Sequence, residues 1–311
     1  MAEVVLPADQ VSAGRDLTNR ECLVIATMLN NLARAVSDIT NQAVGLGLRG
    51  GSRAEEDVND PANSAFPAGG SCIRRAQEAV AFSCFTAQDH LRAFAAVLTV
   101  GSGGPAMSLA TLARGAIEAF GKAHFLLQTD TAEALVVKQL RLAITEVEGS
   151  AAHSEFRRVS GEPVEKDEHI AELKALLGEH GVVYDKKKHS EHKVSITTLA
   201  TAVINDSTPD AKGRASYSQL SAVAHAESPG TAQFIHVSPK NEVGYIRPRT
   251  VVLEYVGHLI ATSDLVLAQM LGYFALEEEH QIWWKSVLEE TWQLYFRLRR
   301  EEETGGSCAD R

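Results

Sequence analysis

The chain has 311 residues, enough for one large domain or two small ones with a substantial buried core. Hydrophobic residues make up 45% and aromatic residues only 6%, so the core must be mainly aliphatic, a composition that favours helices over sheets. The formal charge of -10 disfavours broad nucleic-acid binding, and four cysteines without CxxC spacing argue against a zinc ribbon or a disulfide framework.

Apolar side chains recur at helical spacing along most of the chain. This pattern predicts an all-α fold, a multi-helix bundle with one small β-hairpin. In chain order, helices are expected at residues 17–44, 72–100, 106–128, 131–160, 166–180, 196–204, 209–225, 250–276 and 278–303.

Turn-forming residues predict the segments between the helices. Residues 45–71 are rich in Gly, Ser, Asp and Pro and predict a long surface loop, and the polar residues 185–193 predict another. The Ser-Pro-Gly run at 228–230 is expected to end the helix before it. Apolar runs at 234–237 and 243–246 flank a turn sequence and predict the hairpin.

These elements predict one helical domain over residues 1–303. Its core is expected in residues 70–276, and the helix at 278–303 completes it. The polar residues 304–311 are expected to form a disordered tail.

The N-terminus lacks the basic region and the long apolar stretch of a signal peptide. The most apolar segment, residues 255–276, is interrupted by His258, Asp264 and Gln269, which favours a buried helix over a membrane span. Scattered cysteines fit a reducing compartment. We therefore expect a cytoplasmic protein with no membrane partner.

Arg114 and Glu118 lie one turn apart in the helix at 106–128, which is apolar or small nearly all round. Burial of either charge alone is costly, so both need partners or water. One interpretation is a structural ion pair that fixes helix register. The other is an Arg clamp for an anionic ligand with a carboxylate beside it.

Two other helices carry polar residues near their apolar faces. Asp89 and His90 precede the core position Leu91, and a histidine there is either a hydrogen-bonded core residue or a ligand contact. Tyr217, Ser221 and His225 repeat at four-residue spacing, so they share one helix face. That line either binds a polar ligand and supplies an acid or base, or ends in a His225 that caps the helix C-terminus.

Cofactor and metal signals are weak. The sequence has no Gly-rich phosphate loop and no dinucleotide fingerprint, so no cofactor is expected. Glu277 and His280 have the spacing of a carboxylate-histidine motif but stand in an acidic helix start. Glu254 and His258 share a helix face, yet one pair provides too few ligands for a metal site.

A resemblance is carried by the order of three motifs. These are Asp89-His90-Leu91, the run from Leu112 to Glu118, and the run from Tyr217 to Ser221 with His225. Together they resemble a set of uncharacterised helical proteins from actinomycetes, which look like distant relatives of the HEPN (higher eukaryotes and prokaryotes nucleotide-binding) helical domains. The resemblance covers roughly residues 70–275. It implies a helical bundle, a homodimer, and a pocket where the polar motif residues converge.

The leading hypothesis is therefore an interior pocket that binds a small polar or anionic molecule, in the manner of a specialised-metabolism enzyme. Its expected ligand-binding residues are Arg114, Asp89, His90 and Ser221, and its expected catalytic residues are His225, Glu118 and Tyr217.

Two alternatives stay open. One is a HEPN-like ribonuclease of a defence or toxin system with His225 catalytic. HEPN ribonucleases place a His a few residues after an Arg in one helix, whereas here Arg114 is followed by Glu118, so a nucleic-acid partner is not expected. The other is a non-catalytic oligomeric module that uses the aromatics Trp283, Trp292 and Phe296 of the last helix.

Overall fold

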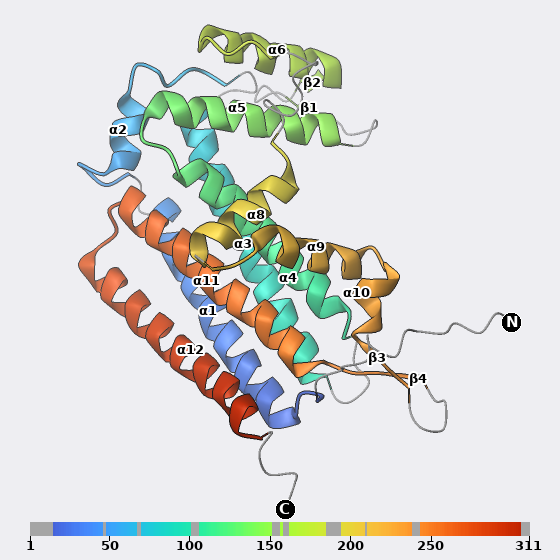
Figure 1. Cartoon of the computed structure of the whole chain (residues 1–311). Helices are drawn as coiled ribbons and strands as arrows, with labels where there is room; N and C mark the ends of the chain where they lie inside the picture. The colour runs from blue at the N-terminus through green and yellow to red at the C-terminus, as the bar shows by residue number, and fades with distance from the viewer. Residues whose placement is uncertain are drawn as a thin grey trace, which may run out of the picture.

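The protein is all-α, as the periodicity predicted (Figure 1). A computed structural model describes residues 15–45, 48–66, 70–100, 106–150, 156–157, 162–184, 194–208, 210–237 and 243–305. Within these ranges the chain forms eleven helices and two short antiparallel strand pairs. The expected loop at 185–193 and the end of the expected tail, 306–311, lie outside the described residues.

Five long helices make up the body of the bundle, and they run roughly side by side in Figure 1. Helix α12 packs against α1 and α11, and α4 packs against α3 and α11, so α4 lies away from the α12 face. The bounds of the five are α1 (Asn19–Gly45), α3 (Cys72–Thr99), α4 (Ser108–Leu127), α11 (Arg249–Tyr273) and α12 (Glu278–Gly305).

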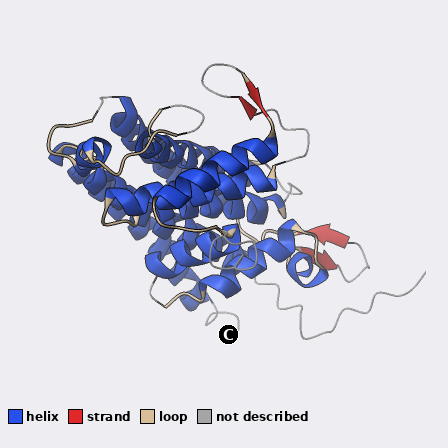
Figure 2. Ribbon diagram, turned by 90° about the horizontal axis from the view of Figure 1, so that it is seen from above, coloured by secondary structure: helices blue, strands red, loops and turns tan. Residues whose placement is uncertain are grey.

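Shorter elements surround this body. Helix α5 packs against α3 and α6, while α8 and α9 both pack against α4. The strand pairs lie at the periphery, as the view from above shows (Figure 2). These elements are α2 (Arg53–Asn59), α5 (Ala132–Gly149), β1 (Phe156–Arg157), β2 (Pro163–Val164), α6 (Lys166–Glu179), α8 (Ile196–Ser207), α9 (Gly213–Ala224), α10 (Ser228–Ala232), β3 (Ile235–Val237) and β4 (Val243–Tyr245).

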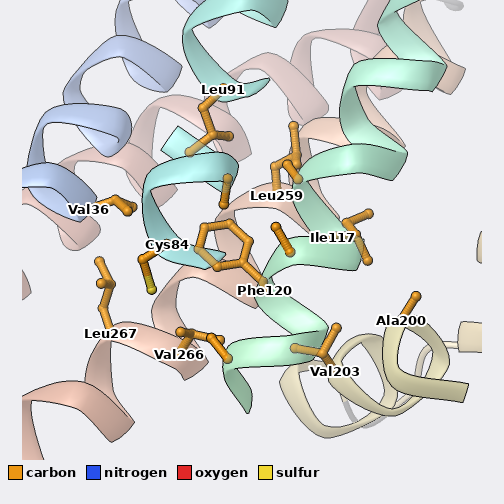
Figure 3. Packing of buried hydrophobic residues seen from close by; sticks show 14 of the residues in the cluster. Val36, Cys84, Leu91, Ile117, Phe120, Ala200, Val203, Leu259, Val266 and Leu267 are labelled. Atoms are coloured by element: carbon orange, nitrogen blue, oxygen red, sulfur yellow. The ribbon is translucent and has the colours of Figure 1, made fainter. Parts of the chain in front are cut away.

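The core is aliphatic and centres on the side chain of Phe120 in α4, which is fully buried. Figure 3 shows this ring among side chains from α3 and α11, including Cys84 and Leu259. Burial of each large apolar side chain stabilises the fold by roughly 1.5–3 kcal/mol. Small residues on α4, such as Ala113 and Ala116, let neighbouring helices approach closely.

A buried ion pair ties the ends of three helices together. Arg249 at the start of α11 is fully buried, and its Nε donates to Glu21 Oε1 at 2.7 Å. Its Nη2 also donates to the carbonyl oxygen of Leu298 in α12. Glu21 belongs to a capping box at the start of α1, since its Oε2 accepts from the Thr18 amide at 2.8 Å.

Three expectations for the segments between helices are wrong. Residues 45–71 are not all loop, because α2 forms within them: Ser52 Oγ accepts from the Glu55 amide, and Glu55 accepts from the Gly51 amide in return. The helix expected at 131–160 ends at Gly149, and Ser150 caps it through the Val147 carbonyl oxygen.

The third correction concerns the Ser-Pro-Gly run. It begins the short helix α10 rather than ending α9, since proline suits the first turn of a helix. Helix α9 stops earlier, with His225 as its C-cap and Ala226 at a φ of 57°. The predicted hairpin is confirmed: Ile235 pairs with Tyr245 and Val237 with Val243.

By length and composition, α1 and α11 are apolar enough to cross a membrane. More than half of each apolar stretch is buried in the bundle, and the core helix of a soluble protein passes the same test.

Candidate functional site

Helix α4 carries the centre of the candidate site because it contacts α3, α5, α8 and α9. Two glycines allow this close packing. A Cβ on Gly115 would lie 2.5 Å from Nε2 of His90 in α3, and a Cβ on Gly121 would lie 2.9 Å from the backbone of Leu199 in α8. Arg114 and Glu118 lie on this closely packed helix, and their side chains are half-buried.

Arg114, Glu118 and Tyr217 form one polar cluster between α4 and α9. Arg114 Nε donates to Glu118 Oε1 at 2.6 Å, and the Tyr217 hydroxyl donates to the same oxygen at 2.7 Å. The guanidinium carbon of Arg114 also lies 5.6 Å from the centre of the Tyr217 ring. Two donors on one oxygen fix the orientation of the Glu118 carboxylate.

The other carboxylate oxygen of Glu118, Oε2, has no hydrogen bond among the described residues. A carboxylate oxygen accepts more than one hydrogen bond. Glu118 also lines a cavity. The Glu118 carboxylate therefore retains acceptor capacity for a bound molecule.

His225 completes the cluster on its solvent side. Its Nε2 lies 3.2 Å from Nη1 of Arg114. A guanidinium can only donate, so the hydrogen bond requires an unprotonated Nε2 on His225. The ring is exposed at the C-terminus of α9, where the sequence also allowed a capping role.

The surroundings shift two pKa values in the cluster. Burial raises the pKa of Tyr217, and the hydrogen bond to Glu118 and the charge of that carboxylate raise it further. Burial opposes the charge on Arg114, but the hydrogen bond and charge of Glu118 outweigh it and raise the pKa of Arg114. Tyr217 therefore stays a hydroxyl donor, and Arg114 stays charged.

A cavity of about 790 Å³ opens beside Glu118 between α3, α4, α5 and the start of α8. Its volume lies within the range of ~300–1,000 Å³ that small-molecule sites occupy. Most of its wall is apolar or small, and Phe82 on α3 is exposed beside it. The lining of the cavity includes Phe82, Thr86, His90, Glu118, Lys122 and Glu146.

The charged groups of the cavity leave little room for an anion. Lys122 Nζ lies 2.7 Å from Glu146 Oε1, so this cation already has a counter-ion. Arg114 is not among the lining residues, and its guanidinium is held by Glu118. Glu118 and Arg114 form one ion pair, and Glu146 and Lys122 form another, so no cation at the described cavity wall lacks a counter-ion. The Arg114 guanidinium does not reach the wall, where the expected clamp for an anion would need it.

His90 is the second polar group of the predicted set at this cavity. Its ring lies against Gly115, three residues before Glu118 on the same face of α4. The ring makes no hydrogen bond or ion pair within the described part of the chain. It is therefore available to donate to, or accept from, a bound molecule.

Of the seven predicted site residues only His90 and Glu118 line the cavity, and two belong neither to the cavity wall nor to the polar cluster. Asp89 is exposed on α3 and does not line the cavity, because adjacent helical residues point about 100° apart. Ser221 shares the α9 face with Tyr217 but is half-buried and also outside the lining. Glu254 and His258 lie 3.8 Å apart on α11 and take no part in the cavity.

Lys122 and Glu146 line the cavity but were not predicted from the sequence. A signal existed for Lys122, which follows Glu118 by four residues and so continues its helix face. Glu146 gave no comparable signal, because its position depends on how α5 packs against α4.

No protein-family model, curated protein or solved structure matches this chain. The resemblance to HEPN domains therefore stays a prediction.

Proposed function

We propose that the protein binds a small amphipathic molecule in the cavity between α3, α4, α5 and α8. The observation that carries the proposal is the Glu118 carboxylate, which Arg114 and Tyr217 hold from one side while it lines an otherwise mostly apolar cavity. The apolar wall accommodates the body of the ligand, and the carboxylate accepts a hydrogen bond from its polar end.

The polar groups at the cavity wall determine which class of ligand head group can bind. A hydroxyl or an ammonium group can donate to Oε2 of Glu118, whereas an anionic head group meets no cation at the described cavity wall that lacks a counter-ion. We therefore propose a ligand with a donor head group rather than the anion that Arg114 was expected to clamp. Tyr217 and Arg114 are positioning residues in this proposal.

The proposal is tested with three probes that share one apolar chain. Isothermal titration calorimetry with 1-hexanol, n-hexylamine and hexanoate should show that the alcohol and the amine bind at least roughly tenfold more tightly than the carboxylate. Equal affinity for all three probes would contradict the proposal that Glu118 recognises the head group of the ligand. Replacement of this residue by Gln should weaken hexylamine binding about tenfold and change hexanol binding much less.

A variant that fills the cavity with a large side chain tests whether the probes bind there, and the same substitution outside the cavity is its control. Thr86 lines the cavity and is exposed, and its hydroxyl donates to the Phe82 carbonyl oxygen at 2.8 Å. Thr27 is an exposed helical threonine with the same kind of bond, to Leu23 at 2.9 Å, and lies outside the cavity. Thr86→Trp should reduce the affinity for hexanol and hexylamine at least roughly tenfold, whereas Thr27→Trp should leave it unchanged. The same loss in both variants would mean that the probes bind elsewhere.

A second candidate function has one observation in its favour. The Arg114 and His225 side chains, 111 residues apart in the chain, come within 3.2 Å of each other, and HEPN ribonucleases use an Arg and a His together. His225 is exposed to solvent, as a substrate would require. The charge of Arg114, however, is already neutralised by Glu118. A ribonuclease assay that compares the wild type with a His225→Ala variant decides between the two proposals.

A further inference from the structure

A second, smaller hollow lies where the start of α1 meets the C-terminal half of α12. Its volume is about 260 Å³, just below the range of drug-sized ligand sites, so it suits a head group or a small metabolite. Four of its eight lining residues are charged and the rest are polar or aliphatic. They are Arg15, Thr18, Arg20, Glu21, Val24, Leu294, Arg297 and Leu298, which makes three of the charged residues arginines.

Among the described residues that line this hollow, one is acidic, Glu21, and guanidinium groups already bind its carboxylate. Arg15 forms a two-pronged contact with it, through Nη1 to Oε2 at 2.9 Å and Nη2 to Oε1 at 2.7 Å. Arg249 donates from the buried side at 2.7 Å. The Glu21 carboxylate is therefore compensated by two guanidinium groups and does not repel an anion in the hollow.

Arg20 and Arg297 add two further positive charges at the same hollow. Both are exposed, and neither has an ion pair or hydrogen bond in the described structure. Asp16, the acidic residue nearest in sequence to Arg15, lies 3.9 Å from Arg247 and is offset by it. Arg20 and Arg297 therefore place two positive charges at a small hollow in a chain whose formal charge is -10.

The arrangement suits one kind of ligand group. Guanidinium groups present planar arrays of N–H donors that match the oxygens of phosphate, and two of them compensate its double charge. The start of α1 adds the positive end of a helix dipole to the same wall. Val24, Leu294 and Leu298 provide an apolar wall for a small organic substituent.

We propose that this hollow binds the phosphate group of a small molecule between Arg20 of α1 and Arg297 of α12. The site is separate from the cavity at Glu118, whose described cations are both paired with carboxylates. Ligand binding there joins the start of α1 to the C-terminal half of α12, which already meet through Glu21, Arg249 and Leu298.

The test uses inorganic phosphate as the probe. Phosphate is titrated into the full chain at constant ionic strength, with potassium chloride as balance, and binding is followed by isothermal titration calorimetry. The wild type should bind, and Arg20→Gln and Arg297→Gln should each weaken binding roughly tenfold or more, because each removes one charge-assisted contact. Both side chains are exposed, so the variants should keep the wild-type circular dichroism and melting curve.

Arg34→Gln is the matched control. Arg34 is an exposed arginine on the same helix and lies outside the hollow, so its loss should leave the affinity for phosphate unchanged. No binding by the wild type, unchanged affinity in Arg20→Gln and Arg297→Gln, or an equal loss in Arg34→Gln would each overturn the proposal. The last result would assign phosphate binding to general surface charge.

Discussion

Glu21→Gln should lower the free energy of unfolding by about 3 kcal/mol at pH 7. Burial alone would raise the pKa of Glu21, but hydrogen bonds from Arg15, Arg249 and Thr18 outweigh it and lower the pKa from 4.5 to about 2. Gln keeps the shape but removes the carboxylate charge that faces the fully buried Arg249 at 2.7 Å. Urea denaturation of both proteins at pH 7 measures the loss.

The sign of the pH dependence follows from the lowered pKa of Glu21. The folded state binds fewer protons than the unfolded state, so the stabilisation is present above pH 4.5 and is lost as the pH falls towards 2. The difference between wild type and Glu21→Gln should therefore shrink to roughly 1.4 kcal/mol at pH 3. A difference that does not change with pH would contradict this assignment.

Glu78→Gln is the control for the loss of one carboxylate charge at an exposed position. Glu78 pairs with Arg75 at 3.2 Å within one helix, and both side chains are substantially exposed. Exposed pairs contribute less than about 1 kcal/mol, so this variant should be nearly as stable as the wild type. A loss equal to that of Glu21→Gln would mean that burial of Glu21 is not the cause.

The long helices could be predicted because their signal is local. The apolar spacing predicted a helix at 72–100, and α3 spans Cys72–Thr99. Helix α2 could also have been predicted, because Ser52 and Glu55 have the sequence spacing of a capping box, and Ser52 does cap the helix. The β1–β2 pair could not be predicted, because a strand of two residues is too short to show a periodic pattern of apolar side chains.

The site could be predicted only in part. Residue spacing shows which side chains share a helix face, but it does not show which other helix packs against that face. Arg114 and Glu118 were expected together and do pair, and Tyr217 joins them from α9. Which of Asp89 and His90 turns inward depends on the rotation of α3 against α4, which is a tertiary property. The same limit explains why Arg114 lies outside the cavity.

The aromatic residues of α12 illustrate the same limit. Trp283, Trp292 and Phe296 were expected to be an exposed surface for oligomer formation. Trp283 and Trp292 instead pack against the core and are half-buried, and only Phe296 among the three is exposed. The homodimer stays a prediction that solution mass can test.

Gly121→Ala should destabilise the protein by about 2–3 kcal/mol, although alanine is the better helix former. A Cβ at this position would lie 2.9 Å from both the carbonyl carbon and the carbonyl oxygen of Leu199 in α8. Because the obstacle is backbone rather than a flexible side chain, α4 and α8 must move apart. Leu199 also lines the cavity beside Glu118, so the variant should bind hexanol more weakly as well.

Gly178→Ala separates this steric effect from the helix propensity of the new residue. Gly178 lies in α6, and a Cβ there would meet nothing within 4 Å, so the substitution should stabilise the protein by up to about 1 kcal/mol. The two variants make the same chemical change in two helices and should shift the urea midpoint in opposite directions. If both raise the midpoint, α4 and α8 are not in backbone contact at Gly121, and the cavity that depends on their packing loses its support.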